Sequence, residues 1–181
     1  KDMNSLKLFR SINQIETIYW SEKKGIPVIV NKHRELDRKI QAENDLDIQI
    51  SSMKSYAHPY EGVLIFKIEY KNKSIVIASD TEGYVYGDTR LIHFAKNADL
   101  LIHDAGYTKN TYKSLDHNKQ GYGHSNMEMA VEVAKKAKVC SLALVHHDPE
   151  YNDSVVAATE KNAKKLFPHS FAAYENQEII V

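Results

Sequence analysis

The alternation of apolar and polar positions divides this chain into strands and helices. Strict alternation or a short apolar run predicts a strand, and apolar residues three or four positions apart predict a helix. The predicted strands cover residues 15–20, 47–57, 62–70, 74–79, 99–106, 140–147 and 170–181. The predicted helices cover residues 26–44 (with Pro27 near the start), 88–98, 125–139 and 154–167, with a turn at 21–25 and a loop at 107–123. A β-hairpin followed by alternating helices and strands indicates a sheet covered by helices.

Capping signals mark the start of three predicted helices. The second helix begins from Asp88 or Thr89, whose side-chain oxygens can accept hydrogen bonds from the first free backbone N–H groups. Ser125 followed by Glu128 predicts a capping box at the third helix. Asp153 is the predicted cap of the last helix.

Polar residues follow the predicted strands at three points. They are Asp80, His103 with Asp104, and His146 with His147, while His58 lies in a loop before a strand. Ligands of α/β folds bind beyond the carboxyl ends of strands, and histidine together with carboxylate binds zinc, manganese or iron. A single histidine at a strand end is more often a capping or surface residue. Three strand ends that carry histidine or aspartate leave a metal site and a chance arrangement as equal alternatives.

Charge and cysteine content narrow the class of protein. Lys and Arg number 24, Asp and Glu also number 24, and the sequence pI is about 7.3. This balance lacks the basic footprint that nucleic-acid-binding proteins usually show. The single cysteine, Cys140, excludes an internal disulfide framework. Its place in "VCSLALV" predicts an inert thiol in a buried strand.

Apolar runs are short throughout the sequence. None approaches the roughly 18 residues of a membrane span, and no signal peptide is visible. A soluble, cytoplasmic protein without a membrane partner is therefore expected. Because the chain begins with Lys1 rather than Met, the native N-terminus and any targeting segment stay open.

Four segments carry a more specific pattern: "VIASDTEG", "NADLLIHDAGYT", "GYGHSNMEMAVEVAKKAKV" and "LALVHHDPEYND". In order and spacing they resemble the metallo-β-lactamase superfamily, and above all its phosphodiesterase and tRNase Z-like branch. The resemblance covers roughly residues 54–155. It implies an α+β fold, the four-layer αββα sandwich, of which this chain would cover about the C-terminal two thirds. Residues 1–181 would then form a single domain that is incomplete at its N-terminus.

The resemblance also implies roles for four residues. His58 and His146 correspond to metal-binding histidines, and Asp80 corresponds to the carboxylate that bridges two metals. His124 corresponds to a histidine that lies beside the scissile phosphate and protonates the leaving group, so Asp80 and His124 are the expected catalytic residues. The proton-transfer role suits histidine, which titrates near neutral pH. The implied cofactors are two divalent metal ions, with zinc first and manganese or iron as alternatives.

Further residues would support this set. Asp104, His147 and Asp148 are expected to orient the metal ligands or to line the pocket. Thr81 and Glu82 would either tune Asp80 or simply form a turn. Two simpler alternatives stay open, namely that His124 packs at a helix N-terminus and that His147 is merely exposed.

One part of the superfamily pattern is absent from this sequence. The HxHxDH motif, which supplies most of the metal ligands, does not occur, and the only histidine before residue 58 is His33 on the first predicted helix. His58, Asp80 and His146 provide three ligands, whereas a two-metal site needs about six. A missing N-terminal segment or a second chain would have to complete the site, and a homo-oligomer is one way to do so.

The resemblance implies a metal-dependent hydrolase in which a metal-bridging hydroxide attacks phosphorus. The hairpin before Asp80 has no room for the long insertion of tRNase Z, and the net charge is zero. Because RNA binding depends on neutralising phosphates, we expect a small phosphodiester such as a cyclic nucleotide, and not tRNA, as the substrate.

Two other interpretations compete with an enzyme. The chain could be a non-catalytic binding or assembly module that keeps the fold without the first-half metal ligands. Alternatively, the histidines could be scattered by chance. The chance interpretation predicts that His58, Asp80, His124 and His146 lie far apart.

Overall fold

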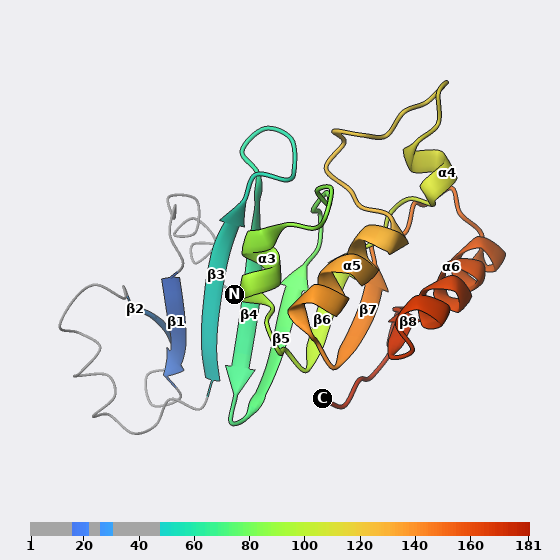
Figure 1. Ribbon diagram of the computed structural model, residues 1–181. Coiled ribbons are helices and arrows are strands. Elements are labelled where there is room, and N and C mark those ends of the chain that lie inside the picture. The colour runs from blue at the N-terminus through green and yellow to red at the C-terminus, as the bar shows by residue number, and fades with distance from the viewer. Residues whose placement is uncertain (1–15, 22–25, 31–47) are drawn as a thin grey trace.

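The structure is a computed structural model, and it describes residues 16–21, 26–30 and 48–181 (Figure 1). These residues form one eight-stranded sheet in the order β2-β1-β3-β4-β5-β6-β7-β8. The strands are β1 Glu16–Ser21, β2 Ile26–Val30, β3 Ile48–Ser55, β4 Val63–Tyr70, β5 Lys73–Ala78, β6 Leu100–Asp104, β7 Ser141–Val145 and β8 Ser170–Ala172.

The direction of the strands changes in the middle of the sheet. Strands β2, β1, β3, β4 and β5 pair antiparallel, as expected for the β4–β5 hairpin. Strands β5, β6, β7 and β8 pair in parallel. The carboxyl ends of β5, β6 and β7 therefore meet at one edge of the sheet, where ligands of such sheets bind.

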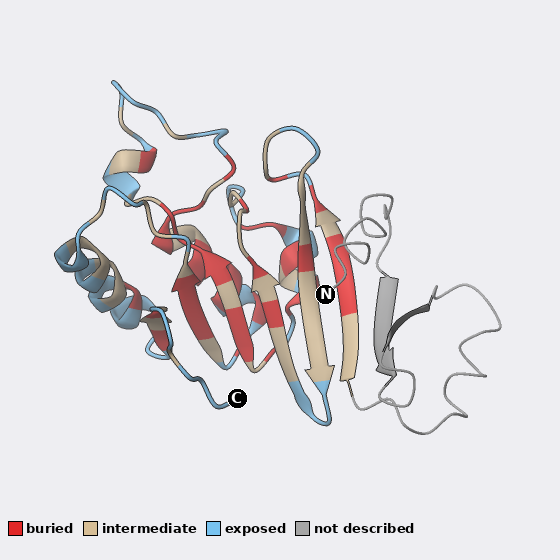
Figure 2. Cartoon of the chain, turned by 180° about the vertical axis from the view of Figure 1, so that it is seen from behind, coloured by how far each residue is buried: buried red, intermediate tan, exposed pale blue. Residues whose placement is uncertain are grey.

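The described helices are α3 Thr89–Phe94, α4 Lys109–Tyr112, α5 Met127–Ala137 and α6 Asp153–Leu166. Helices α3 and α5 lie over one face of the sheet, and α6 lies beside β8 at the far end (Figure 1). The view from behind shows the strands in front of these helices (Figure 2). Among the described residues no helix covers this second face. The α+β fold class is thus confirmed, and the described residues supply one sheet and one helix layer of the expected sandwich.

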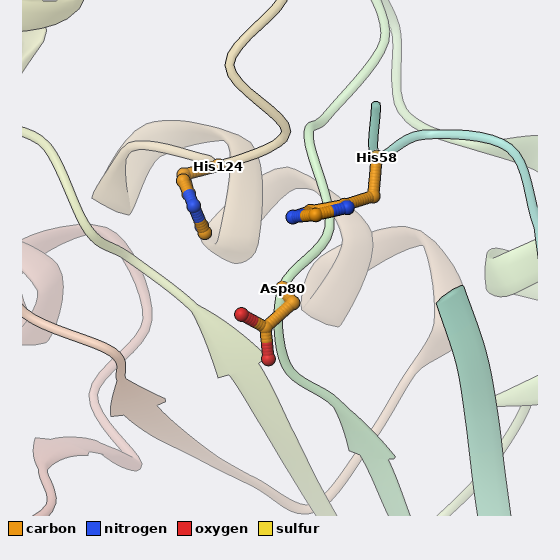
Figure 3. A group of neighbouring side chains, drawn as sticks. All are labelled: His58, Asp80 and His124. Atoms are coloured by element: carbon orange, nitrogen blue, oxygen red, sulfur yellow. The ribbon is translucent and has the colours of Figure 1, made fainter. Parts of the chain in front are cut away.

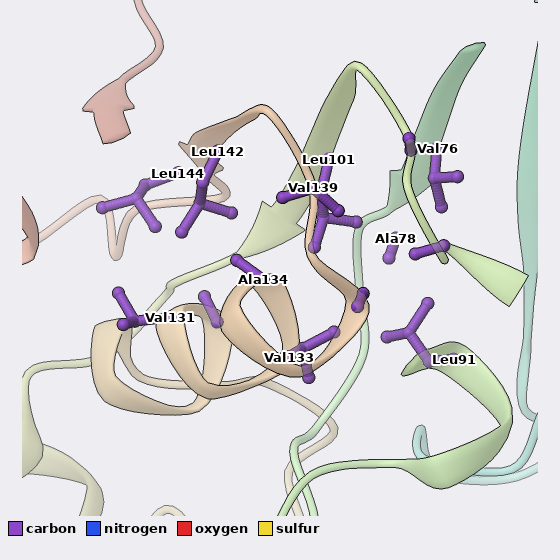
Figure 4. Packing of buried hydrophobic residues seen from close by; sticks show 14 of the residues in the cluster. Val76, Ala78, Leu91, Leu101, Val131, Val133, Ala134, Val139, Leu142 and Leu144 are labelled. Atoms are coloured by element: carbon purple, nitrogen blue, oxygen red, sulfur yellow. The ribbon is translucent and has the colours of Figure 1, made fainter. Parts of the chain in front are cut away.

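The core lies between α5, α3 and the parallel strands (Figure 4). Helix α5 turns Ala130, Val133 and Ala134 toward the sheet, where Leu101 and Leu142 are fully buried. The small alanine side chains let the helix approach the strands closely, which fills the space at the density of a protein interior. Truncating either leucine to alanine would cost about 2–5 kcal/mol.

Two of the expected helix caps shift by one residue. Of the two predicted caps of α3, Asp88 takes the role and accepts from the backbone N–H groups of Arg90 and Leu91. Helix α5, however, is capped by Asn126 rather than Ser125, and α6 by Asn152 rather than Asp153. Asparagine caps at least as well as serine or aspartate. The hydroxyl of Ser125 is engaged elsewhere, because it donates to the backbone oxygen of Thr81 at 2.6 Å.

The helix expected over residues 26–44 is wrong at its start. Residues 26–30 form strand β2, which pairs antiparallel with β1. The run "IPVIV" is rich in β-branched residues, which favour extended backbone. Pro27 is tolerated because β2 is the edge strand of the described sheet. The remainder of that predicted helix, with His33, and most of the predicted turn at 21–25 lie outside the described residues.

Three further expectations need correction. Cys140 is exposed, not buried, because it precedes β7 and lies in the turn that links α5 to the strand. The loop at 107–123 contains the short helix α4. The last predicted strand is limited to Ser170–Ala172. Within the described residues, no helix is long and apolar enough to cross a membrane.

Candidate metal centre

Three candidate residues lie at the carboxyl ends of the parallel strands. Asp80 follows β5, Asp104 ends β6 and His146 follows β7. Asp80 and His146 both have left-handed backbones, with φ of 52° and 63°. This conformation is unfavourable for residues with a Cβ and tends to occur at functional sites. It turns the chain sharply at each strand end, so that both side chains project from the edge of the sheet.

His58 and His124 reach the same place from loops. His58 lies between β3 and β4, and His124 lies just before α5. The two loops touch at Gly123, whose φ is +90° and where a Cβ would come within 2.5 Å of the His58 ring. Only glycine allows this close approach with that backbone. Their rings are in edge contact, with centroids 5.6 Å apart.

The side chains predicted from the sequence gather in one cluster. His58, Asp80 and His124 point toward one another (Figure 3), and each offers a ligand atom within 4.8 Å of the other two. The Nε2 atom of His146 lies 3.0 Å from Oδ1 of Asp80. The rings of His146 and His124 stack at 4.5 Å. The dispersal that the chance interpretation predicts is therefore not found.

Asp104 lies beneath this cluster and holds it in place. Its side chain is fully buried. Oδ1 accepts from the backbone N–H groups of Gly106 at 3.0 Å and Ser125 at 2.9 Å, and Oδ2 lies 2.8 Å from Nδ1 of His124. An ionised carboxylate only accepts hydrogen bonds, so Nδ1 of His124 carries the proton. This leaves Nε2 of His124 as the ring nitrogen that a ligand or a proton can use.

The donor set fits a divalent cation of the zinc, manganese or iron type. His58, Asp80 and His146 supply imidazole nitrogen and carboxylate oxygen, which such metals bind. Asp80 and His146 are each 44% exposed, so an ion can reach them from solvent. Asp104 groups with His124 and His146 by distance, but its oxygens already hold three hydrogen bonds, which suits it to orienting His124 rather than to binding metal.

His103, His147 and Asp148 lie outside this cluster. His103 is fully buried, its Nδ1 lies 2.8 Å from the backbone oxygen of Asp104, and burial lowers its pKa. Burial likewise lowers the pKa of His147, although hydrogen bonds with the backbone of Ala105 and Leu144 act to raise it. Asp148 shapes the turn after His146. Its backbone N–H donates to the backbone oxygen of Gly106, and its side chain accepts from the backbone N–H of Glu150.

Glu82 has a structural role that the sequence did not reveal. Its carboxylate accepts from the hydroxyl of Tyr112 at 2.5 Å and from the backbone N–H groups of Gly121 at 2.8 Å and Gly123 at 3.0 Å. Burial, and then the hydrogen bond to Glu82, raise the pKa of Tyr112. Glu82 thus anchors the loop at residues 107–123 directly before His124. No local pattern signals these contacts, since they link residues 30 to 41 positions apart.

Comparisons with known proteins bear on this geometry. No family model matches the chain. A ribonuclease Z from Picrophilus torridus is 35% identical over 109 residues, which is 60% of this chain and 32% of that protein. A ribonuclease Z from Pyrococcus furiosus is 36% identical over 111 residues, or 61% of this chain and 32% of that protein. The matched region thus spans about one third of the length of these curated relatives.

Solved structures show the same architecture. The metallo-β-lactamase fold protein YhfI from Bacillus subtilis superposes with a TM-score of 0.53 at 24% identity, over 70% of this chain and 46% of that one. The chain has the metallo-β-lactamase fold. Zinc-bound PqqB from Methylobacterium extorquens has a TM-score of 0.53 at 12% identity, over 75% of this chain and 47% of that one. With the sequence relatives, these matches support the tRNase Z-like branch of the superfamily.

The comparisons overturn the expected partner. A small phosphodiester substrate, with tRNA excluded, is wrong, because the matching relatives are named ribonuclease Z. The net charge misled this expectation, since a total of zero averages over basic and acidic surfaces. The loop at 107–123, for instance, carries three lysines against one aspartate.

Proposed function

We propose that His58, Asp80, Asp104, His124 and His146 form part of the active site of a metal-dependent phosphodiesterase. This enzyme would cleave RNA, with tRNA as the substrate class. The observation that carries the proposal is that buried Asp104 holds His124, whose ring contacts the rings of His58 and His146 and lies within ligand distance of Asp80. A buried carboxylate that fixes the tautomer of a histidine beside metal-type donors is an arrangement suited to moving a proton in a metal site. The ribonuclease Z relatives support an RNA phosphodiester as the substrate.

His58, Asp80 and His146 would hold the metal in this proposal. A divalent cation bound there, zinc first, would polarise a phosphoryl oxygen and lower the pKa of bound water. Asp80 contacts His146 directly and lies in the cluster with His58, so it is the residue placed to be shared. Its left-handed backbone holds the carboxylate at the end of β5.

His124 would supply the proton to the leaving oxygen. In its doubly protonated form the ring would keep the Nδ1 proton against Asp104 and give the Nε2 proton to that oxygen, which leaves the Nδ1–H form of the ring. Asp104 also accepts from Ser125, which fixes the chain on the other side of His124.

Metal binding and catalysis can be separated by mutation in the full-length polypeptide that carries this sequence. Asp80→Asn should lose both bound metal and cleavage of a labelled tRNA transcript. His124→Ala should retain metal and lose cleavage by about 10²–10⁴-fold, the range for general acid catalysis. Metal content by elemental analysis and initial cleavage rates measure both effects.

The outcomes distinguish the roles of the two residues. Loss of metal in His124→Ala would make His124 a ligand instead of the acid. Near-normal cleavage by Asp80→Asn would end the proposal. His117→Ala is a matched control, because His117 is exposed on the same loop as His124 and should leave both measurements unchanged.

A further inference from the structure

A row of rings leads outward from the candidate metal centre. The ring of Tyr107 lies 5.9 Å from that of His124, in edge contact. The ammonium group of Lys119 lies 5.6 Å from the centre of the Tyr107 ring and 5.1 Å from that of Tyr122. The row therefore runs from His124 through Tyr107 and Lys119 to Tyr122, and all of its outer members belong to residues 107–123. Figure 1 shows this segment beyond the edge of the sheet to which β6 and β7 point.

The ammonium group of Lys119 has no carboxylate partner within residues 48–181. The ion pairs of this region involve other lysines, at positions 67, 73, 136 and 164. Lys119 instead lies over the rings of two tyrosines, which attract a cation but leave its charge uncompensated. An unpaired lysine held by its neighbours beside a phosphodiesterase site is suited to receive a phosphate.

Tyr122 is exposed and yet firmly placed. The residue is 56% exposed, so a ligand can reach it from solvent. The glycines on both sides, Gly121 and Gly123, donate their N–H groups to the carboxylate of Glu82 at 2.8 and 3.0 Å. The backbone of Tyr122 is thereby held at both flanks. A positioned aromatic ring binds a ligand with less loss of conformational freedom than a mobile one.

We propose that Lys119 and Tyr122 form a nucleotide-binding subsite for the RNA strand next to the scissile phosphate, with Tyr122 stacking on a base and Lys119 pairing with a backbone phosphate. This inference rests on the proposed function. Single-stranded RNA is bound by this combination of an aromatic platform and a positive charge. Tyr107 joins the subsite to His124, so that a strand lying along the row of rings reaches the metal centre.

Binding of a fluorescein-labelled oligoadenylate to the full-length polypeptide tests the subsite without requiring cleavage. Lys119→Met should weaken binding about tenfold and reduce the slope of log K against log salt by about 0.7, because one phosphate contact is lost. Tyr122→Leu should weaken binding about tenfold, through lost stacking, and leave the salt slope unchanged. Lys119→Arg and Tyr122→Phe keep the charge and the ring and should bind as the parent does.

Distant substitutions of the same type serve as controls. Lys161→Met on α6 and Tyr174→Leu after β8 alter exposed residues that belong to neither the row of rings nor the metal cluster, and binding should not change. The subsite is refuted if Lys119→Met leaves both affinity and salt slope as in the parent, or if Lys161→Met reproduces its effect.

Cleavage of the tRNA transcript separates this inference from the proposed function. If the parent cleaves the transcript and Lys119→Met has an unchanged KM, the subsite is wrong and the phosphodiesterase stands. If the parent binds the oligoadenylate through Lys119 and Tyr122 but cleaves no RNA, the subsite stands and the proposed reaction is wrong.

Discussion

Asp80 and Asp104 lie at the ends of adjacent parallel strands, yet the two carboxylates have opposite surroundings. The side chain of Asp104 is fully buried and accepts three hydrogen bonds, two of them from backbone N–H groups. The side chain of Asp80 is 44% exposed and contacts the neighbouring Ser79 hydroxyl and His146. The first carboxylate is part of the folded framework, and the second is open to a ligand. A site that must hold one histidine rigidly and still admit metal and substrate requires both.

The largest expected difference is in stability. In Asp104→Asn the amide oxygen can keep both backbone N–H groups, but the amide N–H₂ then faces the ring N–H of His124, so the variant should lose about 2–3 kcal/mol of unfolding free energy. Asp80→Asn should change it by less than about 0.5 kcal/mol in metal-free buffer, as exposed substitutions do. Urea denaturation of the chain, followed by circular dichroism, measures both. Equal losses would show that the contrast between the two carboxylates has no energetic basis.

The surroundings of Glu82 are intermediate between those of Asp104 and Asp80, so its substitution should cause an intermediate loss of stability. Its carboxylate accepts from three groups but is partly exposed. Glu82→Gln should cost about 1–2 kcal/mol and speed hydrogen exchange at Gly121 and Gly123. Glu150→Gln is the control, because the side chain of Glu150 lies exposed in the turn after β7. Unchanged exchange at both glycines would contradict the anchoring role of Glu82.

Asp99 should give the smallest effect, at the opposite end of β6. The N–H of Ser74, followed by Lys73, lowers the pKa of Asp99 below its ordinary value of 3.8. A lowered folded-state pKa means that the stabilisation is present above about pH 4 and is lost as the pH falls through the folded-state pKa. Asp99→Asn should therefore cost about 0.5–1 kcal/mol at neutral pH. The difference from the parent should shrink toward zero in acid, as urea titrations across this range would show. If the difference in unfolding free energy between Asp99→Asn and the parent does not depend on pH, the ionised carboxylate of Asp99 is not its source.

Much of the fold follows from local pattern. The hairpin of β4 and β5, the buried strands β6 and β7 and the helices α5 and α6 correspond to segments whose apolar spacing is regular. The grouping of Asp80, Asp104 and His146 also follows, because parallel strands bring their carboxyl ends to one edge. The local pattern misled where it was ambiguous: "IPVIV" suits a helix start by its proline and a strand by its branched side chains.

Contacts between distant segments decided the rest. Ser125 is a good cap by sequence, but Thr81 engages its hydroxyl and Asn126 takes the role. Cys140 lies between the buried residues Val139 and Leu142 yet is exposed, since it lies in the turn before β7.

The sequence by itself determined the alternation of strands and helices and the histidines and aspartates that end the strands, because both depend on neighbouring residues. Only the tertiary structure decided that Asp104 is buried beneath His124, that Glu82 holds the loop at 107–123, and that Lys119 lies between two tyrosine rings. Each of these contacts joins side chains or backbone groups whose proximity depends on how loops close over the sheet. Local propensity carries no information about that closure, since it arises from packing of the whole chain.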